Sequence, residues 1–315
     1  MISEAQKRQM RDAVAEIRAK MADAARAAGR DPKDVLLCAA CKTRTVEEVR
    51  YSAELPIDLF GENHVQELVE KTDAAAYNGK PGHFIGHLQT NKVNKVVGRA
   101  ALIQSVDSTR LLDKIDAAAA RLDVVQDILV EINIGEEASK SGVDADGLFP
   151  LLESAAAKEH IRLRGLMAIP PADADETAAR RFFAQMRELL AKANAQHYDR
   201  AQMDILSMGM SGDFTAAIAE GATLVRIGSA IYGARDYSKK MCCSEENLPP
   251  TIKWQRKNHG SVCRGGIYAA RCSHPGKSTY RENRTGRNYA SPTNLPGVGV
   301  LTITACFPAI CRERS

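Results

Sequence analysis

Short apolar runs alternate with helical patterns along most of the chain, and this alternation limits the possible folds more than any other feature. Eight strands are predicted, at residues 35–42, 57–61, 83–88, 102–106, 126–134, 161–169, 204–208 and 224–228. Helical spacing of apolar residues predicts an opening helix at 3–28 and seven helices between the strands, at 45–54, 64–76, 91–98, 109–121, 144–158, 175–195 and 212–220. Strands that alternate with helices favour a parallel sheet of βαβ units. Eight units in about 240 residues predict an α/β fold, a single (β/α)8 TIM-type barrel, with a doubly wound open sheet as the alternative.

The composition changes abruptly after Tyr237, which predicts a domain boundary. Residues 238–315 hold 13 Lys and Arg against 4 Asp and Glu, whereas residues 1–237 hold 30 against 35. Six of the eight cysteines also lie in the later segment, an unusual number for a protein of the reducing cytosol. We therefore predict a barrel at 1–237 and an unrelated basic, cysteine-rich tail at 238–315, which is disordered or non-native.

Charge and composition exclude several classes of function. In the tail, His259 and His274 have no C-x-x-C pair beside them, so a zinc site is not expected. The scattered Lys and Arg residues of the tail permit weak contact with nucleic acid but predict no specific site. No apolar run approaches the roughly 18 residues that span a bilayer, and the N-terminus is a charged helix start. We expect a cytoplasmic protein without a membrane partner.

Polar and glycine-rich segments follow the predicted strands at the end where barrel proteins keep their sites. Lys42 ends the first predicted strand, and the other segments are 61–64, 86–92, 207–213 and 226–229. Nothing comparable lies at the opposite ends of these strands. The sequence therefore predicts a functional site at the carboxyl ends of the strands.

Lys42 has the placement of a Schiff-base lysine. An apolar strand delivers it to the rim of the fold, where it loses hydration, and lost hydration lowers the pKa of an amine. A partly neutral amine can attack an aldehyde. The alternative is a surface lysine that merely follows a strand, and Lys42 alone does not exclude it.

Two loops have the composition of an anion site. Ser211, Gly212 and Asp213 open the helix after the seventh predicted strand, and Gly228 and Ser229 follow the last strand. Backbone amides at a helix start bind anions, and barrels frequently hold phosphate at the loops after their last two strands. The alternative is a capped helix with turn glycines, because Ser and Asp are ordinary N-caps.

Two further patterns are interpreted as structural. His83 and His87 are four residues apart on a strand, where that spacing is too long for shared metal binding, so no metal site is predicted. Cys38 and Cys41 spell a C-x-x-C motif, but a strand points them to opposite faces. They are predicted to be small core residues rather than a redox pair.

Five segments, taken in order, resemble one known family. They are Lys42 with its strand, FGENHVQE at 60–67, HFIGHLQTNK at 83–92, SMGMS at 207–211 and VRIGSAIYGAR at 225–235. Together they resemble the pyridoxal phosphate homeostasis proteins, the YggS/PROSC group, over residues 3–237. The resemblance implies a barrel related to the N-terminal domain of alanine racemase. It also implies pyridoxal 5′-phosphate (PLP) as the cofactor, with no established turnover.

The same resemblance implies roles for individual residues. Lys42 would hold PLP as a Schiff base, Asn63 would lie beside the ring, and Arg226 would face the pyridine nitrogen. An arginine there keeps that nitrogen unprotonated, which makes the ring a weak electron sink. The other cofactor-binding residues implied are Ser211, Gly228 and Ser229 at the phosphate, and Ser207 in the same segment as Ser211. His64 and Ser229 stand where tyrosine and threonine are common in the family, and both keep a polar group.

The expected function is PLP homeostasis by a monomeric carrier that has no robust catalysis of its own and gives PLP to apo-enzymes. The alternative is a PLP-dependent amino-acid racemase, which needs a second acid or base opposite the lysine. In the barrel racemases a tyrosine of a separate β-domain has that role, and the tail is too irregular to be that domain. A cofactor-free aldolase would leave the phosphate loops unexplained. A nucleic-acid binder that used the tail would leave the whole barrel mouth unexplained.

The predicted boundary can be tested with a chain that stops at Tyr237. Because composition and periodicity both change there, the shortened protein should fold, bind PLP as tightly as the full chain and be more soluble. Circular dichroism and PLP titration followed by visible absorbance measure these properties, and limited proteolysis of the full chain should cut the tail first. Failure of the shortened chain to fold would show that the tail belongs to the domain.

Overall fold

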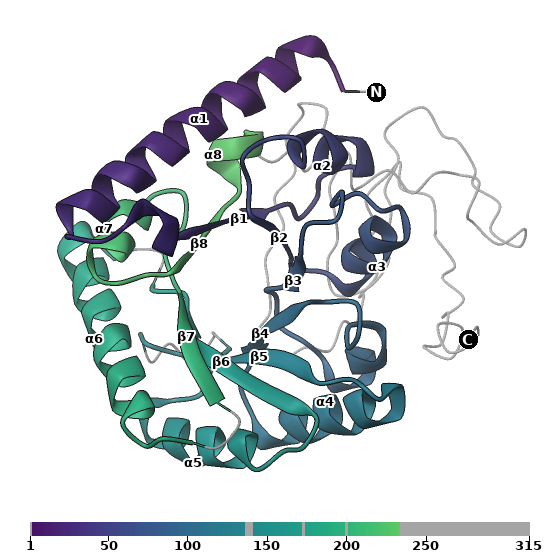
Figure 1. The fold of residues 1–315 in the computed structure, drawn as a ribbon, viewed down its shortest axis with the longest axis vertical. Coiled ribbons are helices and arrows are strands. Elements are labelled where there is room, and N and C mark those ends of the chain that lie inside the picture. Colours follow the sequence, from purple (N-terminus) through teal and green to yellow (C-terminus); the bar gives the residue numbers. More distant parts are fainter. Residues whose placement is uncertain (1, 136–140, 172–173, 199–200, 234–315) are drawn as a thin grey trace, which may run out of the picture. The chain divides into compact units, whose positions relative to one another are not determined.

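Eight parallel strands form a closed barrel in chain order in the computed structural model, which describes residues 2–135, 141–171, 174–198 and 201–233 (Figure 1). The strands are β1 (Leu36–Ala40), β2 (Leu59–Glu62), β3 (Gly82–Phe84), β4 (Leu102–Val106), β5 (Gln126–Ile132), β6 (Ile161–Ala168), β7 (Ala201–Ser207) and β8 (Leu224–Ile227). Pairing of β1 with β8 closes the ring. The predicted (β/α)8 barrel is confirmed, and the open-sheet alternative is wrong.

Helices surround the barrel on its outside (Figure 1). The α-helices are α1 (Glu4–Ala27), α2 (Val46–Ser52), α3 (Val65–Asp73), α4 (Thr109–Leu122), α5 (Ala145–Ala156), α6 (Glu176–Asn194), α7 (Phe214–Ala219) and α8 (Ser229–Tyr232). Two 3₁₀ helices, η1 (Pro32–Asp34) and η2 (Thr90–Lys95), complete the described set. The opening helix α1, predicted at 3–28, packs against α7 and α8 and so closes the outer ring. Of the helices described here, none is long and apolar enough to cross a membrane.

The opening helix shows how local sequence sets these elements. Ser3 Oγ accepts a hydrogen bond from Gln6 N (3.2 Å), and Gln6 Oε1 accepts one from Ser3 N (3.0 Å). This capping box satisfies amides that would otherwise lack partners at the start of α1. The buried side chains recur every three or four residues, at Met10, Val14, Ile17, Met21 and Ala25. They form one apolar stripe that packs against the rest of the domain.

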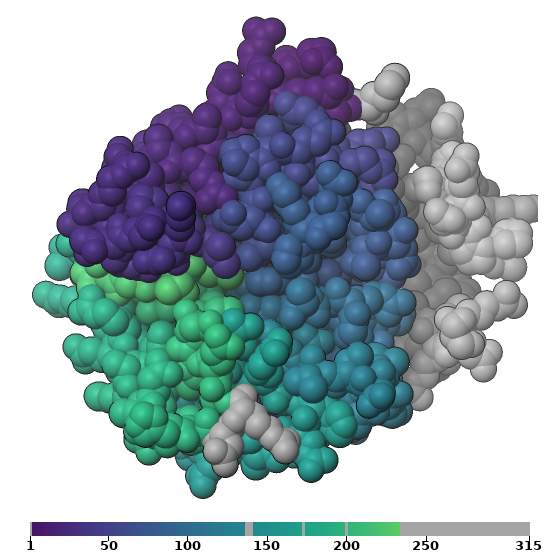
Figure 2. Space-filling model, viewed as in Figure 1, coloured from purple at the N-terminus to yellow at the C-terminus, as the bar shows by residue number. Residues whose placement is uncertain are grey.

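Apolar side chains form the core in two places, outside the ring of strands and inside it. One large cluster lies between the strands and the helices, and it includes Cys41. Two small clusters fill the barrel interior, one of Cys38, Leu59 and Leu224 and one of Leu102, Leu129 and Met167. Cys38 and Cys41 therefore lie on opposite faces of the sheet, so the prediction of two core cysteines is confirmed. Viewed along the barrel, the atoms of the described residues leave no open channel through it (Figure 2).

The third βα unit differs from the prediction in two ways. The strand predicted at 83–88 corresponds to β3, but β3 already ends at Phe84. It ends there because the chain then passes directly over the backbone of residue 63. A Cβ atom at Gly86 would lie 2.2 Å from the Asn63 carbonyl oxygen, so only glycine fits there. The helix predicted at 91–98 is the 3₁₀ helix η2, closed by bonds such as Lys92 N to Gln89 O (2.9 Å). Buried valines at three- and four-residue spacing gave this segment its helical periodicity in the sequence.

The predicted tail at 238–315 lies outside the described residues, as do its cysteines, His259 and His274. The domain boundary at Tyr237 therefore stays a prediction.

Candidate functional site

Lys42 lies at the rim of the barrel, two residues after β1 ends. Hydrogen bonding continues past the strand, since Cys41 N donates to Gly61 O (3.0 Å). Lys42 itself is half-buried, and Thr43 after it has a φ of 68°, a left-handed conformation that is unusual for a β-branched residue. The strand thus ends in a sharp turn immediately after Lys42, at the mouth of the barrel.

The end of β8 lies beside the end of β1. A Cβ atom added at Gly228 would lie 2.9 Å from the carbonyl oxygen of Ala40, so the two backbones approach too closely for a side chain. This contact joins the Lys42 turn to the loop that follows the last strand. Barrel closure therefore brings the first and last predicted segments of the site together.

Two serine hydroxyls meet at the start of α8. Ser229 Oγ donates to Ser211 Oγ (3.2 Å), and Ala230 N donates to the same oxygen (3.4 Å). Asp213 is the N-cap residue of α7, as in the alternative of a capped helix, but its side chain makes no cap bond there and instead accepts from Met210 N (2.6 Å). The exposed Ser229 and the half-buried Ser211 are thus available to an anion at the mouth.

Arg226 lies inside the barrel at the end of a chain of hydrogen bonds. It is 4% exposed, and it donates to Ser207 Oγ (2.5 Å) and to the Ala168 carbonyl oxygen (2.9 Å). Ser207 donates to Gln104 Oε1 (2.7 Å), and the Gln104 amide lies 2.9 Å from His83 Nδ1. Burial lowers the pKa of His83 to about 4, so its ring is neutral near pH 7 and Nδ1 can accept that bond. These partners offset part of the cost of burying a guanidinium group.

The structure brings most of the predicted site residues to one rim. Lys42, Asn63, Ser211, Gly228 and Ser229 follow the carboxyl ends of β1, β2, β7 and β8. Asn63 is half-buried and its backbone contacts Gly86 of the third loop. Ser207 lies deeper, fully buried beneath Arg226, so it supports that arginine rather than lining the mouth.

The sequence reasoning did not identify Glu131, a buried acid in the barrel interior. It lies on β5 and is 7% exposed. Burial, reinforced by the charge of Asp107 and opposed by that of Arg226, raises the pKa of Glu131 to about 7. The signal in the sequence was an acidic residue that interrupts the run of apolar residues from Ile128 to Ile132 of this strand.

His83 and His87 lie in different surroundings and do not share a partner. His83 is held by Gln104 inside the barrel, whereas the more exposed His87 lies 3.6 Å from Asp107 and 3.2 Å from the Ser141 hydroxyl. Among the described residues no three His, Cys, Asp or Glu side chains are grouped so that they could hold a metal ion.

Comparisons with known proteins agree on one family. Residues 13–236 match the family described as alanine racemase, N-terminal domain. A pyridoxal phosphate homeostasis protein of Aquifex aeolicus is 39% identical over 210 residues, which are 67% of this chain and 91% of that protein. The protein of the same name from Escherichia coli K12 is 38% identical over 231 residues, 72% of this chain and 97% of that protein. This chain belongs to the pyridoxal phosphate homeostasis protein family.

This member of the family is also similar to solved structures. PipY of Synechococcus elongatus, solved with PLP bound, is 29% identical with a TM-score of 0.62, and the match covers 71% of this chain and all of PipY. An alanine racemase of Clostridium difficile, at 17% identity and a TM-score of 0.56, shares the fold; the match covers 71% of this chain and 57% of the racemase. The resemblance stated from the sequence motifs is confirmed.

Replacement of Glu131 by Gln should stabilise the cofactor-free protein at pH 8 more than at pH 5. Because the folded state holds the Glu131 proton up to about pH 7, stability falls as pH rises between the unfolded pKa of 4.5 and that value. The neutral amide removes this loss, which amounts to at most about 3 kcal/mol. Urea unfolding of both proteins at the two pH values measures the difference. An equal effect at pH 5 and pH 8 would show that Glu131 does not titrate in this range.

Proposed function

We propose that this protein is a cytosolic carrier that holds PLP on Lys42 as a Schiff base and transfers it to apo-enzymes. The observation that supports this most is the shared rim on which barrel closure brings the Lys42 turn beside Gly228 and the loop that follows it. The solved PLP complex of PipY, a relative at 29% identity, supports the choice of cofactor. A monomer is the proposed state of the carrier.

The residues present fit the chemical groups of PLP. Hydroxyls of Ser211 and Ser229, 3.2 Å apart, offer donors to a phosphate, and the missing side chain at Gly228 lets backbone amides approach. The Lys42 amine would bond to the aldehyde carbon with loss of one water molecule. PLP when bound would supply an electrophilic aldehyde and an aromatic ring that accepts electrons.

Arg226 would lie toward the pyridine nitrogen, where its charge matters more than its contacts. A fixed positive charge opposes protonation of that nitrogen, so the ring withdraws electrons weakly. Ser207 and Ala168 hold the guanidinium from below, so its position does not depend on the cofactor. A weak electron sink suits a carrier, because PLP bound in this way would catalyse few reactions of the amino acids that it meets.

The alternative function, amino-acid racemisation, needs a second proton donor or acceptor on the ring face opposite Lys42. The likeness to alanine racemase, at 17% identity, concerns the fold alone. Arg226 near the ring nitrogen does not by itself separate the two functions. We therefore base the choice of a carrier on the family to which the chain belongs and test catalysis directly.

The first test locates the covalent bond. Purified protein mixed with PLP should develop a visible absorbance band, and borohydride reduction followed by mass spectrometry should find the cofactor on Lys42. Lys42→Ala should lose the band and the adduct but keep the circular dichroism spectrum, because a half-buried rim residue contributes little to the core. A reduced adduct on another lysine, or an unchanged band in Lys42→Ala, would refute the assignment.

The second test separates a carrier from an enzyme. The PLP-loaded protein is incubated with each L-amino acid in deuterium oxide, and exchange at Cα is followed by NMR. We expect exchange far below an ordinary enzymic rate of about 1 s⁻¹, together with slow transfer of PLP to an apo-enzyme. Exchange at about 1 s⁻¹ or faster would favour the racemase.

A further inference from the structure

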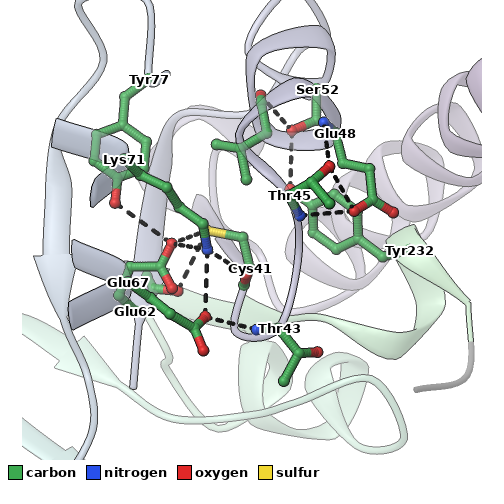
Figure 3. Close-up of polar contacts among 12 residues, drawn as sticks. Cys41, Thr43, Thr45, Glu48, Ser52, Glu62, Glu67, Lys71, Tyr77 and Tyr232 are labelled. Atoms are coloured by element: carbon green, nitrogen blue, oxygen red, sulfur yellow. Dashed lines mark hydrogen bonds and ion pairs between the residues drawn. The ribbon is translucent and has the colours of Figure 1, made fainter. Parts of the chain in front are cut away.

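A buried cluster of charges lies beside the turn that runs from Cys41 to Thr43 (Figure 3). Glu62 at the end of β2 is fully buried, Lys71 of α3 is 1% exposed, and the Glu67 side chain is 14% exposed. Lys71 Nζ lies 2.7 Å from Glu62 Oε1 and 3.4 Å from Glu67 Oε2. Such a cluster is costly to bury, since desolvation opposes each charge. Its position beside the site therefore calls for a functional explanation.

The cluster holds the backbone on both sides of Lys42. Lys71 Nζ donates to the carbonyl oxygen of Cys41 (2.8 Å), in the peptide group before Lys42. Glu67 Oε2 accepts from Thr43 N (2.6 Å), the amide that follows Lys42. Figure 3 shows the Lys71 amine between the two carboxylates, with Cys41 and Thr43 on opposite sides of the turn.

Every proton of the Lys71 ammonium has an acceptor. The three acceptors are Glu62 Oε1, Glu67 Oε2 and the Cys41 carbonyl oxygen, which matches the three donors of a charged lysine. Burial alone would lower the pKa of Lys71, but the neighbouring acidic groups Cys41, Glu62 and Glu67 outweigh it and raise the pKa. Lys71 is therefore a fixed cation, and it fixes the carbonyl to which it donates.

The turn needs such support because of its conformation. Thr43 has a φ of 68°, which its β-branched side chain disfavours, so the turn would relax if its amide were released. A relaxed turn would move the Lys42 backbone and with it the reach of the Lys42 amine. The amide that holds this strained residue in place is the one that donates to Glu67.

We propose that Glu67 and Lys71 are positioning residues for Lys42: they hold the two peptide groups that flank it and so fix where its amine meets the cofactor. This inference rests on the proposed function, in which Lys42 bonds to PLP. Neither residue is required to touch PLP. Their loss should slow formation of the covalent bond without weakening the non-covalent grip on the phosphate and ring.

The test compares Glu67→Ala with Glu67→Gln in the full chain. Alanine removes the acceptor of the Thr43 amide, whereas the glutamine oxygen can still accept from it. Glu48→Ala is the matched control, because the Glu48 side chain is 15% exposed and accepts from Thr45 N (2.7 Å) in the same loop, two residues further from Lys42. If Glu67→Ala does not fold, Glu67→Asp tests the same contact with the charge kept.

Three measurements are made on each variant. The first is the rate at which the visible band appears when PLP is added to the cofactor-free protein. The second is the affinity for pyridoxine 5′-phosphate, which has an alcohol in place of the aldehyde and cannot bond to an amine. The third is hydrogen exchange of the Thr43 amide in the cofactor-free protein, which reports the contact with Glu67 directly.

In Glu67→Ala the visible band should appear about tenfold more slowly or slower still, because a small displacement of a reacting group lowers the reaction rate by a large factor. Its Thr43 amide should exchange faster, while its affinity for pyridoxine 5′-phosphate stays unchanged. Glu67→Gln should recover most of the rate, and Glu48→Ala should react like the unaltered protein.

Two results would overturn the proposal. One is a normal rate in Glu67→Ala despite faster Thr43 exchange, and the other is an equal loss of pyridoxine 5′-phosphate affinity, which would indicate collapse of the pocket. Failure of the proposed function is a separate outcome, seen as an unchanged band in Lys42→Ala. The exchange measurement on Thr43 is valid in either case, because it needs no cofactor.

Discussion

The pairing of β1 with β8 is the interaction on which the rest of the structure depends. Cys38 of β1 lies beside Arg226 of β8 in that pair, and Lys42 follows Cys38 by four residues, just beyond the end of β1. Because all eight strands are parallel, closure turns segments about 190 residues apart into neighbours on one rim. An open sheet with the same strands would leave β1 and β8 apart, and neither the amine nor the serine hydroxyls would then form a site.

The barrel interior changes from apolar to polar toward that rim. Below it, Leu59, Leu102 and Leu129 belong to dry clusters that give the strands their stability. Above them, the hydrogen-bonded chain from His83 through Gln104 and Ser207 reaches Arg226. A buried polar chain of this kind specifies one arrangement when all of its members are satisfied, because a broken member would leave a neighbour without a partner in a medium of low dielectric. The fold thus fixes the position of the guanidinium before any ligand arrives.

The sequence predicted the barrel and the rim but not what lies behind the rim. Strand and helix periods are local, and the polar segments at strand ends gave Lys42, Asn63, Ser211, Gly228 and Ser229 directly. The burial of Glu62, Lys71 and Glu131 was not predicted, because a charged residue in a sequence looks the same whether it is solvated or buried. Only the packing of α3 on β2, or closure around β5, buries these side chains. The end of β3 was misplaced for a similar reason, since the contact of Gly86 with residue 63 is between two loops.

The site is assembled from two halves that the chain builds separately. Residues 41–71 supply the amine and the charges that hold its turn, whereas residues 207–230 supply the arginine and the hydroxyls. Beyond the strand pairing, Arg44 joins the halves by donating to the Gly233 carbonyl oxygen (2.8 Å) and lying over the ring of Tyr232. A carrier benefits from this division, because one half can grip phosphate and ring while the other makes a bond that a competing amine can replace. In the proposed carrier, release would require exchange of the bond at Lys42 as well as loss of the phosphate and ring contacts, and the geometry proposed for Glu67 and Lys71 would set the rate of the covalent step.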